Sequence, residues 1–155
     1  MPVPVLKEFL DREGVRYTSI RHSPAFTAQE VAHYAHVSGK HLAKTVIVKL
    51  DDRLAMAVIP APERVDLTAL REATGAQHAD LASETEFQMR FPDCDLGAMP
   101  PFGNLYGMEV YLDSQLTHDP EIAFAAGSHD EVLRLGYADF ARIVRPRVVE
   151  LAVNA

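Results

Sequence analysis

Two apolar segments joined by a short acidic turn place the strongest constraint on how this 155-residue chain can fold. Residues 43–50 and 54–60 read as strands, and Asp51-Asp52 between them predicts a hairpin. Side chains alternate between the two faces of a strand, and here apolar residues fall on both faces of each segment. This pattern predicts a sheet that is covered on both sides, or a barrel with helices outside it.

One lysine interrupts the apolar pattern of the first strand. Alternation puts Lys44 on the same face as three hydrophobic residues, Val46, Val48 and Leu50. An ammonium group in such a row costs free energy unless it has an anionic or carbonyl partner. The structural alternative is a lysine at a strand end whose stem carries its charge to water. Lys44 is therefore a candidate functional residue.

A segment rich in glycine and proline follows half a chain later and reads Gly97-Ala98-Met99-Pro100-Pro101-Phe102-Gly103. The prolines restrict φ, and the glycines let another molecule approach the backbone closely. This combination suits a ligand-binding loop, although a tight turn without any ligand is the structural alternative. Asp93 and Asp95 flank the segment, and either carboxylate is a candidate for binding an α-ammonium group.

The third candidate element is Ala126-Gly127-Ser128-His129 near the end of the chain. A neighbouring serine and histidine suggest a nucleophilic hydrolase, but adjacent residues rarely form a catalytic dyad. The nucleophile-elbow motif is also absent. Water is therefore favoured over Ser128 as a nucleophile, and a simple turn with a surface histidine is the structural alternative.

The rest of the chain reads as a mixture of helices and strands without regular β–α–β alternation. Helices are expected near residues 6–13 before Gly14, at 28–36 after the capping box Thr27–Glu30, at 67–74 between Asp66 and Gly75, after the capping box Ser83–Glu86, and at 138–144. Further strands are expected at 16–21, 79–82, 109–113 and 122–125, with a loop at 91–103 and a tail after Pro146. Residues 128–131 also resemble a capping box, so periodicity leaves 132–135 open between helix and strand.

Composition and charge narrow the class of protein. The chain has a net charge of −7, which argues against an indiscriminate nucleic-acid binder. The first fifty residues nevertheless carry an excess of three positive charges and all four lysines, and Lys40 and Lys49 are candidate phosphate contacts. The single cysteine, Cys94, forms no internal disulfide, and no apolar run approaches the roughly 20 residues of a membrane span. We expect a cytoplasmic protein without a membrane partner.

Three short stretches carry a family resemblance: Ala43-Lys44-Thr45-Val46, the glycine-x-x-x-proline element from Gly97 to Pro101 with Phe102-Gly103, and Ala126-Gly127-Ser128-His129. In order and spacing the chain resembles the YbaK/prolyl-tRNA-synthetase-associated domain family, the free-standing aminoacyl-tRNA deacylases. The resemblance covers nearly the whole chain and implies one domain over residues 1–155. It implies an α/β (mixed α+β) fold with a mixed, barrel-like β-sheet flanked by helices, and favours a strand at 132–135.

The resemblance also implies a reaction: trans-editing hydrolysis of the ester of a mischarged tRNA, metal-independent and without a cofactor. Lys44 would be catalytic, donating a hydrogen bond to the ester carbonyl as negative charge develops there. The substrate-binding residues would be Gly97, Met99, Pro100, Pro101, Phe102, Gly103, Gly127, Ser128 and His129, and the tRNA contacts Lys40 and Lys49. Pro101 and Phe102 would wall a pocket for a small amino acid, and His129 would orient water or contact the ribose.

The partner implied by the resemblance is the acceptor end of aminoacyl-tRNA, with an aminoacyl-tRNA synthetase as a second candidate. Two other functions stay open beside the deacylase. A non-catalytic tRNA- or synthetase-binding module could keep the same fold. A metal-dependent hydrolase could use His33, His36 and His41, because His33 and His36 have a spacing that can chelate, although no full zinc signature accompanies them.

Overall fold

A computed structural model of the chain describes residues 3–24, 27–36 and 42–154. The helices are α1 (Pro4–Arg12), α2 (Ala28–Tyr34), α3 (Leu67–Thr74), α4 (Glu84–Phe87) and α5 (Tyr137–Val144), with 3-10 turns at Gln88–Arg90, Gly103–Leu105 and Ser114–Thr117. The strands are β1 (Tyr17–Arg21), β2 (Leu42–Leu50), β3 (Arg53–Pro60), β4 (Glu63–Val65), β5 (Ala79–Leu81), β6 (Glu109–Asp113), β7 (Glu121–Ala125), β8 (Glu131–Gly136), β9 (Arg147–Val149) and β10 (Ala152–Asn154).

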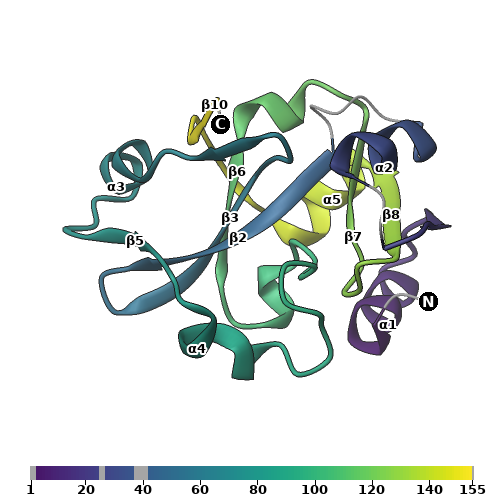
Figure 1. Cartoon of the computed structure of the whole chain (residues 1–155), viewed down its shortest axis with the longest axis horizontal. Helices are drawn as coiled ribbons and strands as arrows, with labels where there is room; N and C mark the ends of the chain where they lie inside the picture. Colours follow the sequence, from purple (N-terminus) through teal and green to yellow (C-terminus); the bar gives the residue numbers. More distant parts are fainter. Residues whose placement is uncertain (1–2, 25–26, 37–41, 155) are drawn as a thin grey trace.

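The strands form one large mixed sheet with the predicted hairpin at its centre (Figure 1). The strand order is β1-β8-β7-β2-β3-β6-β9, β5 pairs with β2, and β4 pairs with β10 in a separate small sheet. The hairpin β2–β3 is antiparallel, whereas β2 with β7 and β3 with β6 are parallel. The mixed sheet flanked by helices, expected from the sequence, is confirmed.

Both faces of the central hairpin are buried, as its apolar pattern predicts. On one face Ala43 and Ile47 join a core that includes Phe9 of α1 and Phe140 of α5. On the other face Val48 and Leu50 pack with Leu70 of α3 and with residues of β3. Helix α2 covers a neighbouring part of this second face, where it packs on β7 and β8. The sheet is therefore a central layer between helices.

Most of the expected boundaries are confirmed by local hydrogen bonds. Thr27 and Ser83 both form the predicted capping boxes, and the Asp66 side chain accepts from the Ala69 backbone N–H at the start of α3. Gly14 and Gly75 follow their helices with φ of 67° and 75°. These are left-handed conformations that suit glycine at the end of a helix.

The tertiary structure resolves one open alternative in the second half of the chain and corrects one expectation there. Residues 132–135 lie in β8, a strand and not a helix, because β8 pairs with β1 on one side and β7 on the other. The segment after Pro146 is not an irregular tail, since it forms β9 and β10. Sequence reasoning also missed β4, whose only strand partner among the described residues is β10.

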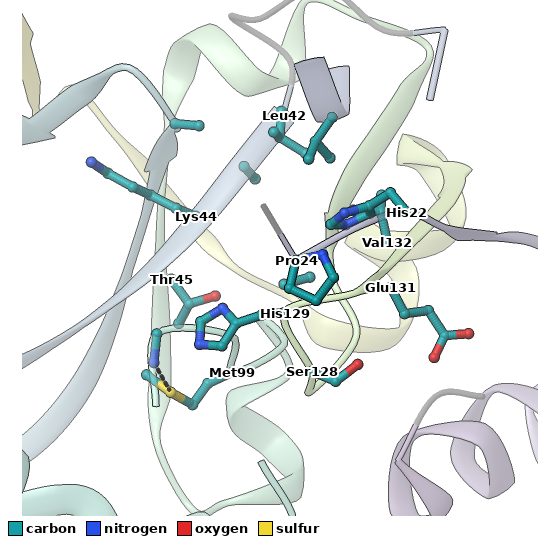
Figure 2. A pocket seen from close by; sticks show the side chains of 15 residues that line it. His22, Pro24, Leu42, Lys44, Thr45, Met99, Ser128, His129, Glu131 and Val132 are labelled. Atoms are coloured by element: carbon teal, nitrogen blue, oxygen red, sulfur yellow. Dashed lines mark hydrogen bonds between the residues drawn. The ribbon is translucent and has the colours of Figure 1, made fainter. Parts of the chain in front are cut away.

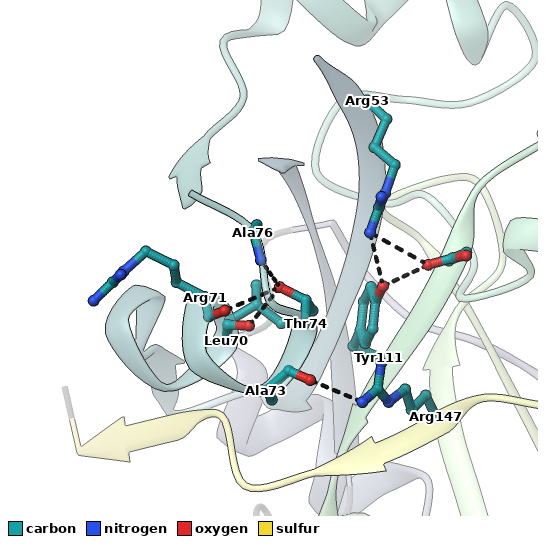
Figure 3. A network of polar contacts seen from close by, with 9 residues as sticks. Arg53, Leu70, Arg71, Ala73, Thr74, Ala76, Tyr111 and Arg147 are labelled. Atoms are coloured by element: carbon teal, nitrogen blue, oxygen red, sulfur yellow. Dashed lines mark hydrogen bonds and ion pairs between the residues drawn. The ribbon is translucent and has the colours of Figure 1, made fainter. Parts of the chain in front are cut away.

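Specific side chains hold the C-terminal segment to the body of the molecule. The buried carboxylate of Asp113 accepts hydrogen bonds from the backbone of Leu151 and Ala152, at 2.9 and 3.1 Å. Arg147 donates to the carbonyl of Ala73 at the end of α3, as Figure 3 shows. These bonds position β10 beside β4. Among the described residues no helix combines the length and the apolar character that crossing a bilayer requires.

Candidate active site

The candidate active site is a cavity at the point where β2 and β7 separate. Among the described residues the two strands pair through Leu42 with Ala123 and through Ala43 with Phe124. The residues that follow on each strand, Lys44 and Thr45 on β2 and Ala125 on β7, line a cavity of about 250 Å³. The complete lining is His22, Pro24, Val31, Leu42, Ala43, Lys44, Thr45, Ala61, Gly97, Met99, Ala125, Ser128, His129, Glu131 and Val132. Three stretches that are far apart in sequence thus meet at one cavity (Figure 2).

Hydrogen bonds join the two loops of the cavity to one another. The backbone N–H of Asp95 donates to the carbonyl of Gly127 at 2.8 Å, and the N–H of Gly127 donates to the carbonyl of Ala98 at 2.9 Å. The N–H of His129 donates to the Asp95 carboxylate at 3.2 Å. The glycine- and proline-rich loop and the serine–histidine turn therefore form one hydrogen-bonded unit, a relationship that sequence spacing does not reveal.

His129 is held in one tautomer by this unit. Its Nε2 lies 2.7 Å from the carbonyl oxygen of Leu96. Because a carbonyl only accepts, Nε2 carries the proton, and Nδ1 of the neutral ring is left as an acceptor. Gly97 lies against this ring, and its φ of 87° is a backbone conformation that favours glycine. The ring can therefore accept a proton or orient a water molecule through Nδ1.

Ser128 uses its hydroxyl differently from a catalytic nucleophile. Its Oγ donates to the Asp130 carboxylate at 2.6 Å, and this hydrogen bond is the largest cause of the lowered pKa of Asp130. A nucleophilic serine instead donates to the histidine that removes its proton. The geometry thus assigns Ser128 to the wall of the cavity and agrees with water as the nucleophile.

Lys44 is half-buried and has no hydrogen bond or ion pair with any residue in the described ranges. Burial lowers the pKa of its ammonium group, because removal from water disfavours the charged form. Figure 2 shows its side chain leaving β2 on the side opposite Thr45, with the nitrogen directed away from His129 and Met99. Its stem lines the cavity, while the ammonium lies toward a second groove on the α3 side of β2.

Thr45 is the cavity residue whose chemistry the sequence analysis overlooked. It follows Lys44 and therefore faces the opposite side of β2, toward the loop that carries Met99 (Figure 2). Its hydroxyl oxygen is buried and has no hydrogen-bond partner among the residues that the structure describes. A hydroxyl can donate one hydrogen bond and accept two, so leaving it unpaired costs free energy. Strand alternation predicts that Thr45 lies on the face of the strand opposite Lys44. The sequence does not reveal that this face is turned toward the loop that carries Met99.

Several residues of the glycine- and proline-rich loop pack in the protein interior and do not line the cavity as expected. Within residues 97–103, Gly97 and Met99 line the cavity, whereas Pro100, Pro101, Phe102 and Gly103 do not. The expectation that Phe102 walls the pocket is wrong, because its ring is fully buried among Phe9, Phe124 and Phe140. A Cβ on Gly103 would come within 2.2 Å of the Met108 carbonyl oxygen, so glycine is required there by packing.

Gly127 also lies beside the cavity and not on its lining. Its φ is 102°, and a Cβ on it would lie 2.4 Å from the Val3 side chain. The turn therefore requires glycine for backbone conformation and close packing. Asp93 and Asp95 are exposed and are not among the lining residues, and binding of an α-ammonium group by either carboxylate stays a prediction.

Of the two expected phosphate contacts, the structure describes only Lys49, which does not line the cavity. Lys49 lies near the far end of β2 and forms an ion pair with Glu86 at 2.9 Å. Lys40 and His41 lie outside the described residues. His33 and His36 line a separate groove with Arg21 and Arg134, and no cluster of three potential metal ligands occurs among the described residues.

Comparison with known proteins is consistent with this geometry. Residues 22–143 match the model of a family described as the aminoacyl-tRNA editing domain. A multifunctional Ser/Thr-tRNA deacylase of Escherichia coli, ProXp-y, is 28% identical over 151 residues, covering 94% of this chain and 90% of the relative. The prolyl-tRNA editing protein ProX of Acetoanaerobium sticklandii is 25% identical over 142 residues, covering 88% and 86%.

Solved structures share the fold at low sequence identity. A structure assigned as a candidate trans-editing enzyme for prolyl-tRNA synthetase superposes with a TM-score of 0.84 at 18% identity, covering 98% of this chain and 97% of that one. A scaffold used for computational epitope grafting superposes with a TM-score of 0.86, also at 18% identity and with the same coverage.

Proposed function

Since the chain belongs to the aminoacyl-tRNA editing domain family, we propose that it is a deacylase that acts in trans on mischarged tRNA. It hydrolyses the ester bond between an amino acid and the terminal ribose of the tRNA. Two relatives that match most of the chain are named as a Ser/Thr-tRNA deacylase and a prolyl-tRNA editing protein. The acceptor end of the tRNA is the part that must reach the cavity, because the ester is located there.

The observation that carries this proposal is the convergence of Lys44, Gly97, Met99 and His129 on one cavity. An ester hydrolase needs an attacking water, a group that accepts its proton, and positive charge or hydrogen-bond donors near the developing oxyanion. The acceptor Nδ1 of His129 can orient the water and take its proton. Lys44 is the flexible cation at the cavity, and rotation of its four-carbon stem can bring the ammonium to the ester carbonyl.

The size and chemistry of the cavity support a small amino acid with a hydroxyl group. A volume of about 250 Å³ leaves little space for a large side chain once the terminal ribose is present. Within the described part of the chain the buried hydroxyl of Thr45 has no partner, and a seryl hydroxyl is a suitable one. A site that hydrogen-bonds a substrate hydroxyl discriminates strongly against analogues without it. We therefore propose seryl-tRNA as a better substrate than alanyl-tRNA.

The direct experiment is a hydrolysis assay with purified protein and a set of mischarged tRNAs carrying seryl, alanyl, prolyl, leucyl and phenylalanyl esters. We expect the seryl ester to be cleaved fastest and the alanyl ester next, with activity unchanged after exhaustive treatment with EDTA. Binding of tRNA without hydrolysis of any ester would instead support the non-catalytic module. Loss of activity with EDTA and recovery with zinc would support a metal-dependent hydrolase.

A further inference from the structure

A second groove adjoins the cavity on the α3 side of β2 and shares Lys44 with it. The groove has a volume of about 590 Å³. It is lined by Lys44, Val46, Arg64, Val65, Asp66, Leu67, Thr68, Leu81 and Val153. Its walls come from β2, β4, the start of α3, β5 and β10, so several separate parts of the chain enclose it. The side chain of Lys44 therefore lines both the cavity and this groove.

The charges in this groove are unbalanced and favour an anion. Among the described residues, neither Lys44 nor Arg64 has a hydrogen bond or an ion pair through its side chain. The acidic residue of the lining, Asp66, directs one carboxylate oxygen to the Ala69 backbone N–H at the start of α3. Two cations without protein partners thus face one carboxylate that already caps a helix. A phosphate group would supply the partner that Arg64 lacks, and Lys44 stays available to the adjoining cavity.

The remaining wall of the groove is apolar and partly open to solvent. Val46, Val65 and Val153 are half-buried, and Leu81 is 60% exposed, an unusual fraction for a leucine. Single-stranded nucleic acid binds in grooves whose cations contact the phosphates and whose walls contact the unstacked bases. The nine residues that line this groove include no aromatic ring, so a base would pack on the aliphatic side chains or on the guanidinium of Arg64. Double-stranded RNA would not place its bases against such a wall.

We propose that this groove holds the unpaired nucleotides preceding the terminal adenosine of the tRNA, with Arg64 contacting their phosphates. The inference rests on the proposed deacylase function. It follows from the position of the groove, because a strand whose last nucleotide enters the cavity past Lys44 continues into the hollow that shares this residue. The apolar wall then contacts the bases, and Arg64 sets the direction in which the strand leaves the cavity.

The test uses the full-length protein and two seryl esters, seryl-tRNA and 3′-O-seryl-adenosine, which lacks the preceding nucleotides. Arg64→Ala should raise KM for seryl-tRNA about tenfold, the effect of losing one charge-assisted contact, and leave kcat nearly unchanged. It should not alter the rate on seryl-adenosine. Arg64→Lys should recover part of the loss. The slope of log affinity against log salt for uncharged tRNA should become shallower by about 0.7, as expected for one phosphate on a single strand.

Arg71→Ala is the matched control, because Arg71 is an exposed arginine on nearby α3 that does not line the groove and extends away from its neighbours in Figure 3. It should behave as the parent with both esters. If Arg64→Ala leaves KM for seryl-tRNA unchanged, or affects both esters equally, the groove does not bind the strand. If the parent cleaves neither ester, the deacylase proposal fails. Salt-dependent binding of uncharged tRNA, with and without its last three nucleotides, then tests the groove separately.

Discussion

The Nε2 atom of His129 lies 2.7 Å from the carbonyl oxygen of Leu96, a contact that fixes which ring nitrogen carries the proton. Leu96 immediately precedes the glycine- and proline-rich loop, so one loop of the cavity orients the base supplied by the other. Replacing His129 with glutamine keeps an N–H donor near Leu96 but removes the basic nitrogen.

We expect His129→Gln to lower kcat by roughly 10²- to 10⁴-fold, the usual contribution of a general base. The melting temperature should stay near that of the parent, because the side chain is exposed at the mouth of the cavity. Rates on seryl-tRNA and a thermal melt are the measurements. A variant with parental kcat would show that water is activated by another group, such as the hydroxyl of the tRNA ribose.

Lys44→Ala should lower deacylation by about 10²-fold or more, as does the loss of a donor to a developing oxyanion. Its stability should be unchanged or slightly higher, because a half-buried cation without a partner is removed. Hydrolysis rates and thermal melts of the same preparation separate the two effects. Lys7→Ala is the control, since Lys7 pairs with Asp11 on the surface of α1. Full activity in Lys44→Ala would refute a catalytic role.

The lowered pKa of Lys44 predicts a pH dependence of both activity and stability. If the charged form is required, kcat/KM should fall as pH rises through this lowered pKa, at a lower pH than for an ordinary lysine. Lys44→Arg should move that alkaline decline to higher pH, because arginine stays charged. The profile is measured after subtraction of uncatalysed ester hydrolysis, and identical alkaline limbs in both proteins would contradict the assignment.

The sign of the stability effect is opposite to that of activity. Between the folded pKa of Lys44 and its higher unfolded value, the unfolded chain binds more protons than the folded one. The cost of burying the charge is therefore fully present below the folded pKa and disappears as pH rises through this interval. Relative to Lys44→Met, the parent should gain stability over the same range in denaturant titrations.

Thr45→Val tests whether the unpaired hydroxyl selects the substrate. Valine has nearly the same shape, so the cavity keeps its size and loses one donor and acceptor. We expect the rate on seryl-tRNA to fall by about tenfold, which corresponds to one hydrogen bond, and the rate on alanyl-tRNA to change little. The ratio of kcat/KM for the two esters is the readout. An unchanged ratio would place the amino-acid side chain elsewhere in the cavity.

Met99 and Phe102 should respond differently although they are only three residues apart. Met99 lines the cavity, so Met99→Ala should enlarge it and increase cleavage of leucyl esters relative to alanyl esters. Phe102→Ala should instead destabilise the protein by about 3–5 kcal/mol, because it removes a ring from the core. Chemical denaturation and a rate series across amino acids make the comparison. A stable Phe102→Ala with a broadened substrate range would return Phe102 to the pocket.

Local sequence patterns were sufficient for several helix starts and for the central hairpin. The capping boxes at Thr27 and Ser83 depend on residues three apart, and such contacts form whatever the rest of the chain does. The apolar alternation of residues 43–50 likewise implied a strand buried on both faces. Residue patterns also marked Lys44, Gly97 and His129 as candidates, the resemblance suggested their roles, and the fold places all three around one cavity.

The tertiary structure decided the features that depend on partners distant in sequence. Residues 128–131 satisfy a helix-capping pattern, yet 131–136 form β8 because strands on both sides supply hydrogen bonds to its backbone. Phe102 and Met99 belong to one loop, but only the packed core determined that the ring faces inward and the thioether faces the cavity. Strand alternation placed Lys44 and Thr45 on opposite faces of β2, whereas the separation of β2 from β7 after Ala43 decided that both would border the cavity. Pairing and packing over long sequence distances fix these positions, because the free energy of each placement comes from neighbours that no local pattern contains.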